Sequence, residues 1–182
     1  MNIKTLISAG LVVVSLAACT SNNDAAKEAE KSTEVQQTTT DNHAAAAPSS
    51  SALPSFTVQN VNGDAVNLQS FKGKKVFVNL WATWCPPCRR EIPSIQKLAQ
   101  SVDSSNVAFV MLSLDDDFTK AKSYVQKQKI TLPVYYPGEH LPELFNVPGI
   151  PVTFIFNENG ELVRRIDGGD DYNTNKYKEL LK

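Results

Sequence analysis

The sequence predicts an α/β fold, and three consecutive segments carry this prediction. Residues 75–81 form an apolar run rich in β-branched and aromatic side chains, which is typical of a buried strand. From Pro86 onward apolar residues recur at helical spacing, and residues 107–114 then form a second apolar run. A strand, a helix and another buried strand make a βαβ unit, whose crossover is expected to be right-handed.

Length and charge limit what the protein can be. A chain of 182 residues allows one domain of modest size. The formal net charge is −1, so the composition indicates neither a nucleic-acid partner nor an electrostatic membrane patch. We expect a monomer that binds no nucleic acid.

Residues 1–18 have the pattern of an export signal. Lys4 gives a positively charged start, residues 6–16 are apolar but too short for a good membrane span, and small residues precede Cys19. The segment before Cys19 resembles a bacterial lipobox, which implies that Cys19 becomes the lipidated N-terminus of the mature protein. An ordinary signal peptide followed by an unrelated cysteine is the alternative. Export would place the other two cysteines where disulfides persist.

Residues 19–52 are predicted to be the lipidated cysteine followed by a disordered linker. The segment is dense in small, polar and charged residues and cannot bury enough apolar surface to offset its ordering entropy. The folded domain is therefore expected to span residues 53–182. Its first element is a predicted hairpin, with strands at 56–60 and 66–68 on either side of an Asn-Gly turn.

Two cysteines, Cys85 and Cys88, lie between the strand at 75–81 and the helix that follows. Proline suits a first helical turn, so Cys85 should stand at the helix start and Cys88 one turn into it. Unpaired N–H groups and the helix dipole favour an anion there, so Cys85 is expected to have a lowered pKa and to attack first, as a thiolate. Half of a zinc site or a purely structural bridge would give the same spacing. The sequence has no second cysteine pair, and the strand-to-helix context favours redox chemistry.

The remaining elements follow from the same patterns. We expect the three aspartates at 115–117 to cap a helix at 118–129, because acidic side chains suit a helix N-terminus; a metal site is the alternative. A short apolar segment at 132–136 follows. Further strands are predicted at 152–156 and 161–166 around an Asn-Gly turn, and a short helix at 174–182.

The segment 81–93, Trp-Ala-Thr-Trp-Cys-Pro-Pro-Cys-Arg-Arg-Glu-Ile-Pro, resembles the active-site segment of thioredoxin-fold proteins of the TlpA/ResA type. The resemblance extends from about Leu53 to the C-terminus. It implies a thioredoxin fold, with helices flanking a central mixed sheet, an added N-terminal β-hairpin and a central insertion at 115–147. It also implies a membrane-tethered, extracytoplasmic thiol–disulfide oxidoreductase.

A second segment takes its role from this resemblance. It implies that the bond between Ile150 and Pro151 is cis and lies against the disulfide, so that the Ile150 backbone could pair with an extended substrate segment. Without the resemblance, a trans proline at the edge of a strand would be the default. Trp84, expected to be partly exposed, and Pro86 complete the predicted substrate-binding set.

The proton partner of the cysteines is predicted by resemblance as well. Thioredoxin itself has a buried acid six residues before the first cysteine, and the matching residue here is Asn79, which does not titrate. The resemblance assigns the role to Glu91, which lies three residues after Cys88 on the same helical face. A partly buried Glu91 would have a raised pKa and could accept a thiol proton; the alternative is a solvated helix residue. Neither a cofactor nor a metal is predicted.

Three functional hypotheses follow. The leading one is a lipid-anchored enzyme that faces the periplasm from a bacterial membrane, the outer membrane included, and reduces disulfides of specific partner proteins, with cytochrome c maturation as one implied setting. Its electrons would come from an upstream membrane donor. The second is a disulfide oxidase or isomerase in envelope protein folding. The third is a copper chaperone on the same fold, which would need three residues between its cysteines and a placed histidine. Here two residues separate the cysteines, and His140 has no evident position.

Overall fold

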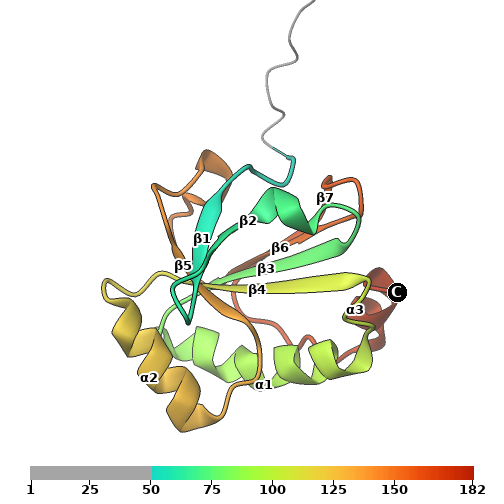
Figure 1. The fold of residues 1–182 in the computed structure, drawn as a ribbon. Helices are drawn as coiled ribbons and strands as arrows, with labels where there is room; N and C mark the ends of the chain where they lie inside the picture. The colour runs from blue at the N-terminus through green and yellow to red at the C-terminus, as the bar shows by residue number, and fades with distance from the viewer. Residues whose placement is uncertain (1–50) are drawn as a thin grey trace, which may run out of the picture. The chain divides into compact units, whose positions relative to one another are not determined.

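The computed structural model describes residues 51–182 as a seven-stranded sheet packed against helices (Figure 1). The predicted signal peptide at 1–18, the lipidation site Cys19 and the linker before residue 51 lie outside the described residues. The strands are β1 Thr57–Asn60, β2 Ala65–Asn67, β3 Lys75–Trp81, β4 Val107–Ser113, β5 Val134–Pro137, β6 Val152–Phe156 and β7 Leu162–Asp167. The helices are α1 Pro86–Ser101, α2 Phe118–Gln128 and α3 Asn175–Leu180, with short 3-10 turns η1 Leu68–Phe71 and η2 Glu143–Phe145. None of these described helices is long and apolar enough to cross a bilayer.

The strand order β2-β1-β5-β4-β3-β6-β7 makes a mixed sheet. At its centre, β3 pairs in parallel with β4 on one side and antiparallel with β6 on the other. The β1–β2 hairpin joins the sheet by antiparallel pairing of β1 with β5, which in turn runs parallel to β4. The predicted α/β fold, mixed sheet and N-terminal hairpin are confirmed. The segment between β4 and β6 adds α2, β5 and η2.

Successive side chains of β3 point to opposite faces of the sheet, and each face has its own core. Helices α1, α2 and α3 cover one face of the sheet (Figure 1), and Phe77 packs in a core with their side chains. Val78 and Leu80 point the other way, into a core that includes Phe145 of η2. Burying a side chain of this size contributes about 1.5–3 kcal/mol. Because β3 is buried on both faces, it is a rigid base for whatever follows its C-terminal end.

Helix α1 begins where the sequence predicts. Cys85 is its N-cap, with an extended backbone and a sulfur that accepts a hydrogen bond from the Cys88 N–H. Pro86 and Pro87 occupy the first turn, where a missing N–H costs nothing. The buried side chains of this helix are Cys88, Glu91, Ile92, Ile95 and Leu98. Their helical spacing explains why α1 lies flat on the sheet.

The predicted acidic cap of α2 is confirmed, but only one of the three aspartates that follow β4 provides it. Asp117 alone is the N-cap, and its carboxylate accepts a hydrogen bond from the first turn. Asp116 is exposed, and Asp115 is 2% exposed. Asp115 turns back toward the sheet edge and meets Thr83, while Asp117 reaches the first turn of α2.

Smaller differences concern where elements end. Helix α2 stops at Gln128, one residue before its predicted end, because Lys129 adopts a left-handed conformation with φ of 53°. Strand β4 ends at Ser113, also one residue early, and β7 begins and ends one residue late. The terminal helix is shorter than predicted, since Thr174 is its N-cap and it ends at Leu180.

Candidate active site

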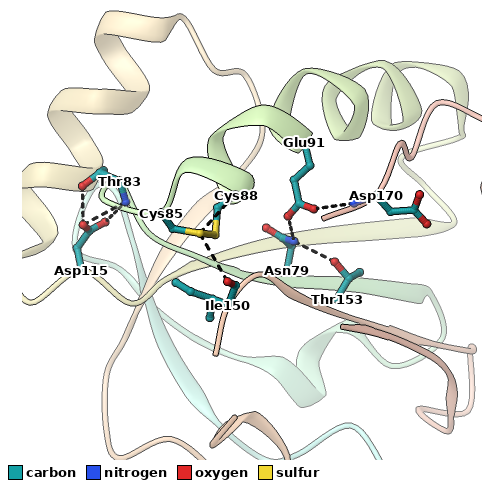
Figure 2. Close-up of a disulfide and its surroundings, with 9 residues drawn as sticks. All are labelled: Asn79, Thr83, Cys85, Cys88, Glu91, Asp115, Ile150, Thr153 and Asp170. Atoms are coloured by element: carbon teal, nitrogen blue, oxygen red, sulfur yellow. Dashed lines mark hydrogen bonds between the residues drawn. A yellow bond between two sulfur atoms is a disulfide. The ribbon is translucent and has the colours of Figure 1, made fainter. Parts of the chain in front are cut away.

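The candidate site lies where the chain leaves the C-terminal end of β3 and enters α1 (Figure 2). A disulfide joins Cys85 and Cys88, whose Cα atoms are 5.3 Å apart. The backbone N–H of Cys88 donates a hydrogen bond to Cys85 Sγ at 3.3 Å. A thiolate at Cys85 would receive the same hydrogen bond and the positive end of the helix dipole, and both would stabilise its charge.

Burial separates the two cysteines. Cys88 is 0% exposed, whereas Cys85 keeps 3% of its surface open. The small exposed fraction of the pair therefore belongs to Cys85, which an incoming sulfur can approach from outside. Cys88 can react with Cys85 but is shielded from solvent by α1 and the sheet.

The peptide bond between Ile150 and Pro151 is cis, as predicted. Pro151 is buried just before β6, while Ile150 is only half-buried. The carbonyl oxygen of Ile150 lies 3.7 Å from Cys85 Sγ, so this backbone borders the disulfide directly (Figure 2).

The two tryptophans near the site have different environments. Trp81 is fully buried, and its ring centre lies 5.8 Å from that of Tyr124 on α2. Trp84, next to Cys85, is 62% exposed, in agreement with the predicted partial exposure. Pro86, on the other side of Cys85, is exposed too. Trp81 thus anchors the start of the loop in the core, whereas Trp84 and Pro86 present apolar surface beside the reacting sulfur.

Glu91 is almost completely buried, at 3% exposure. Its carboxylate accepts hydrogen bonds from Asn79 Nδ2 at 2.7 Å and from the Asp170 backbone N–H at 3.3 Å. Burial raises the pKa of Glu91 to about 7, because the cost of desolvating the charge outweighs these two hydrogen bonds, which lower the pKa. The predicted burial and raised pKa are confirmed. A pocket opens beside the carboxylate, lined by Pro87, Arg90, Glu91, Gly169, Asp170 and Asp171.

Asn79 connects Glu91 to the sheet. Its Nδ2 group also donates to Thr153 Oγ1 on β6, at 2.9 Å. The same Thr153 oxygen accepts a hydrogen bond from the Tyr172 hydroxyl at 2.7 Å. Asn79, Thr153 and Tyr172 are all 0% exposed. The carboxyl group therefore sits at the outer end of a buried polar chain that spans β3, β6 and the segment before α3.

A second buried carboxylate holds the loop that precedes Cys85. Asp115 accepts hydrogen bonds from both the backbone N–H and the hydroxyl of Thr83, and from the Ser113 hydroxyl. These contacts join the end of β4 to the loop at the end of β3. They fix the path of the chain into α1.

Sequence reasoning missed Asp115, Thr153 and Asp170 as residues of the site. Asp115 had a usable signal, because it follows a strand parallel to β3, and the carboxyl ends of parallel strands meet at one edge of a sheet. Thr153 also had one, since period-two alternation places it on the same face as the buried Ile155. Asp170 contributes its backbone N–H, a contact that no side-chain pattern announces. Among residues 51–182, no three His, Cys, Asp or Glu side chains form a group that could hold a metal ion, and His140 is exposed.

Comparison with known proteins gives a consistent family. The Redoxin family model matches residues 48–181. The chain is 29% identical over 130 residues to thiol-disulfide oxidoreductase ResA of Bacillus thuringiensis subsp. konkukian. The aligned residues cover 71% of this chain and 74% of that protein. It is 32% identical over 109 residues to the thioredoxin-like protein YneN of Bacillus subtilis, covering 59% and 64%.

Solved structures agree with this result. A thiol:disulfide interchange protein of the thioredoxin family from Chlorobium tepidum TLS superposes with a TM-score of 0.63 at 30% identity, covering 72% of this chain and 95% of that one. The thioredoxin domain of a thiol-disulfide oxidoreductase from Bacteroides vulgatus superposes with a TM-score of 0.65 at 23% identity, covering 73% and 97%, and shares the fold. The predicted thioredoxin fold is confirmed.

Proposed function

This chain belongs to the Redoxin family as a TlpA/ResA-type thioredoxin-fold protein with thiol–disulfide oxidoreductase activity, and from that premise we propose that it reduces disulfides of specific extracytoplasmic partner proteins. The observation that carries the proposal is the disulfide between Cys85 and Cys88 at the start of α1, with the Ile150 carbonyl beside the outer sulfur. A cysteine pair in this position can pass two electrons per cycle.

The cycle starts from the dithiol. The Cys85 thiolate attacks one sulfur of the substrate disulfide, so that a new bond joins Cys85 to that sulfur while the other substrate sulfur leaves as a thiolate. Cys88 then loses its proton and attacks Cys85 Sγ. The Cys85–Cys88 disulfide closes, and the second substrate sulfur leaves as a thiolate. The substrate has gained two electrons, the cysteine pair has lost them, and a membrane electron donor must restore the dithiol.

Glu91 is the proposed acceptor of the Cys88 proton. Both side chains are buried on the sheet-facing side of α1, one helical turn apart. A carboxyl group with a pKa of about 7 exchanges protons readily near neutral pH, which is the property that a general base for a thiol requires. The pocket beside Glu91 gives the proton a route to solvent after the disulfide has formed.

Substrate segments are proposed to bind along the exposed side of Cys85. The half-buried backbone of Ile150, ahead of the cis Pro151, is placed to pair with an extended peptide. Exposed Trp84 and Pro86 would cover apolar side chains next to the substrate disulfide. This arrangement supports action on proteins with an accessible, extended disulfide region.

Export and anchoring complete the proposal. The pattern of residues 1–18 and the lipobox-like segment before Cys19 support a lipid-anchored protein that faces the periplasm, with the outer membrane as a possible site. Similarity to ResA proteins supports an extracytoplasmic location and a membrane electron donor. The TlpA/ResA resemblance favours cytochrome c maturation as the setting.

Trapping the mixed disulfide tests this function. Cys88→Ser should accumulate a covalent complex between Cys85 and its substrate in envelope extracts, whereas Cys85→Ser should form none. A measured reduction potential near that of thioredoxin, about −270 mV, would support the reducing direction. A reduction potential of about −120 mV, typical of a strong oxidant, would instead make the protein an oxidase.

A further inference from the structure

The side chain of Asn79 is hydrogen-bonded to Glu91 and points toward the disulfide (Figure 2). It lies on β3 beneath α1, and Figure 2 shows its side-chain amide between Cys88 and the Glu91 carboxylate. Both hydrogens of Nδ2 are engaged, one by Glu91 Oε1 and one by Thr153 Oγ1. These two bonds fix the plane of the amide and thereby the direction of its oxygen.

Among residues 51–182, the oxygen of this amide has no hydrogen-bond partner. Asn79 is 0% exposed, and Oδ1 makes no hydrogen bond within the described part of the chain. In Figure 2 the oxygen lies on the side of the amide that faces the disulfide. An acceptor that is buried without a donor is costly, and native structures rarely keep one without a reason.

Reduction supplies the missing donor. In the disulfide, neither Cys85 nor Cys88 carries a proton. When the bond opens, Cys88 gains an S–H group that is buried at the same place and needs an acceptor. In Figure 2 the unpaired oxygen of Asn79 on β3 points toward the sulfur of α1 that becomes this donor on reduction.

We propose that Asn79 is a positioning residue that accepts a hydrogen bond from the reduced Cys88 thiol through Oδ1 while it donates to Glu91 through Nδ2. The inference rests on the proposed role of Glu91 as proton acceptor and adds the group that couples the two. One amide then holds the thiol that must lose a proton and the carboxylate that must take it. Donation to Oδ1 polarises the amide and strengthens its bond to the carboxylate.

Several charged and titratable groups face Glu91 from the segments packed around it. The pKa of Asp170 is lowered, chiefly by the hydrogen bond from the Tyr177 hydroxyl. Burial raises the pKa values of Tyr172 and Tyr177 above their ordinary value of 10. Arg90 and Asp171 line the open pocket. Glu91 itself has its pKa raised to about 7 by burial, so its carboxyl changes charge near neutral pH.

The test follows the two chemical steps separately. Reduced protein is mixed in a stopped-flow instrument with dithiodipyridine, an aromatic disulfide that releases a coloured thione at each step. The first release reports attack by Cys85, and the second reports resolution by Cys88. Both rates are measured across pH for the wild type, Asn79→Leu, Glu91→Gln and the double variant. Val78→Ala, a buried change on the opposite face of β3, controls for general destabilisation.

We expect Asn79→Leu to leave the first release within about twofold of wild type and to slow the second at least about tenfold, the effect of losing a hydrogen bond to a charged group. In Asn79→Leu, the pH inflection of the second release should move above the wild-type value near 7, because the hydrogen bond from Asn79 lowers the pKa of Glu91 in the wild type. In the double variant, the second release should stay within about twofold of the rate of the slower single variant, because the effects of coupled groups do not add. Asn79→Ala should behave in the same way if the leucine variant fails to fold.

One result would overturn the role of Asn79 and leave the proposed function intact. In that result, Glu91→Gln slows the second release, but Asn79→Leu keeps both the wild-type rate and the wild-type pH inflection. If Glu91→Gln also leaves the second release unchanged, the proposed role of Glu91 fails and the inference fails with it.

Discussion

The Asp115 carboxylate accepts two hydrogen bonds from Thr83, one from its hydroxyl at 2.6 Å and one from its backbone N–H at 3.1 Å. Thr83 lies two residues before the nucleophilic Cys85, so the end of β4 determines where that sulfur stands. Asp115→Ala would leave these half-buried donors without their acceptor and would remove a carboxylate that is itself buried. We expect a loss of about 3 kcal/mol in the free energy of unfolding and a slower attack by Cys85, measured by denaturation and stopped-flow thiol exchange.

A neighbouring aspartate provides the control. Asp116 is exposed, and Asp116→Ala should change stability by less than about 0.5 kcal/mol and leave the attack rate unchanged. Equal effects at both positions would mean that the bonds to Thr83 do not set the geometry of the loop.

Glu91 should make stability depend on pH. Its folded pKa of about 7 lies above the ordinary value of 4.5, so between these two values the folded protein binds more protons than the unfolded chain. Stability therefore falls as pH rises through this window and levels off above about pH 7. The difference between the folded and the ordinary pKa of Glu91 corresponds to about 3 kcal/mol in the free energy of unfolding.

The comparison of wild type with Glu91→Gln isolates this contribution. The difference in unfolding free energy between the two proteins should shift by about 3 kcal/mol in favour of the variant between about pH 4.5 and pH 8, as followed by urea denaturation. A difference that stays constant over this range would show that Glu91 titrates normally.

Trp84 should matter for protein substrates and not for folding. Its side chain is 62% exposed beside Cys85, so Trp84→Ala should change stability by less than about 0.5 kcal/mol. We expect the rate with a small aromatic disulfide to stay within about twofold and the rate with a trapped protein substrate to fall about tenfold or more, as for an aromatic hot spot. Val163→Ala, at an exposed apolar position on β7, should change neither rate.

The parts of the site that lie close together in the sequence could be predicted from it. The N-cap position of Cys85 follows from the prolines after it, and the raised pKa of Glu91 follows from its place on the buried face of α1. The cis bond before Pro151 came from a resemblance to a known family, because nothing in the neighbouring residues distinguishes cis from trans.

Contacts between distant segments follow less directly from the sequence than contacts between neighbours do. The sequence shows only that Asn79 cannot titrate, yet in the structure it joins β3, β6 and α1, because Thr153 and Glu91 both bind its amide. Asp115 was assigned to helix capping by local pattern, and only its parallel neighbour β3 brings Thr83 within reach. Such contacts depend on sheet order and register, which short-range patterns do not contain.

Alkylation of the reduced protein across pH tests the central claim most directly, namely that the start of α1 makes Cys85 an acidic and reachable thiol. The account predicts that Cys85 reacts with iodoacetamide through an apparent pKa at least about one unit below the ordinary 8.5, while buried Cys88 reacts far more slowly. If Cys85 instead shows an apparent pKa of about 8.5 and reacts no faster than Cys88, the account is contradicted.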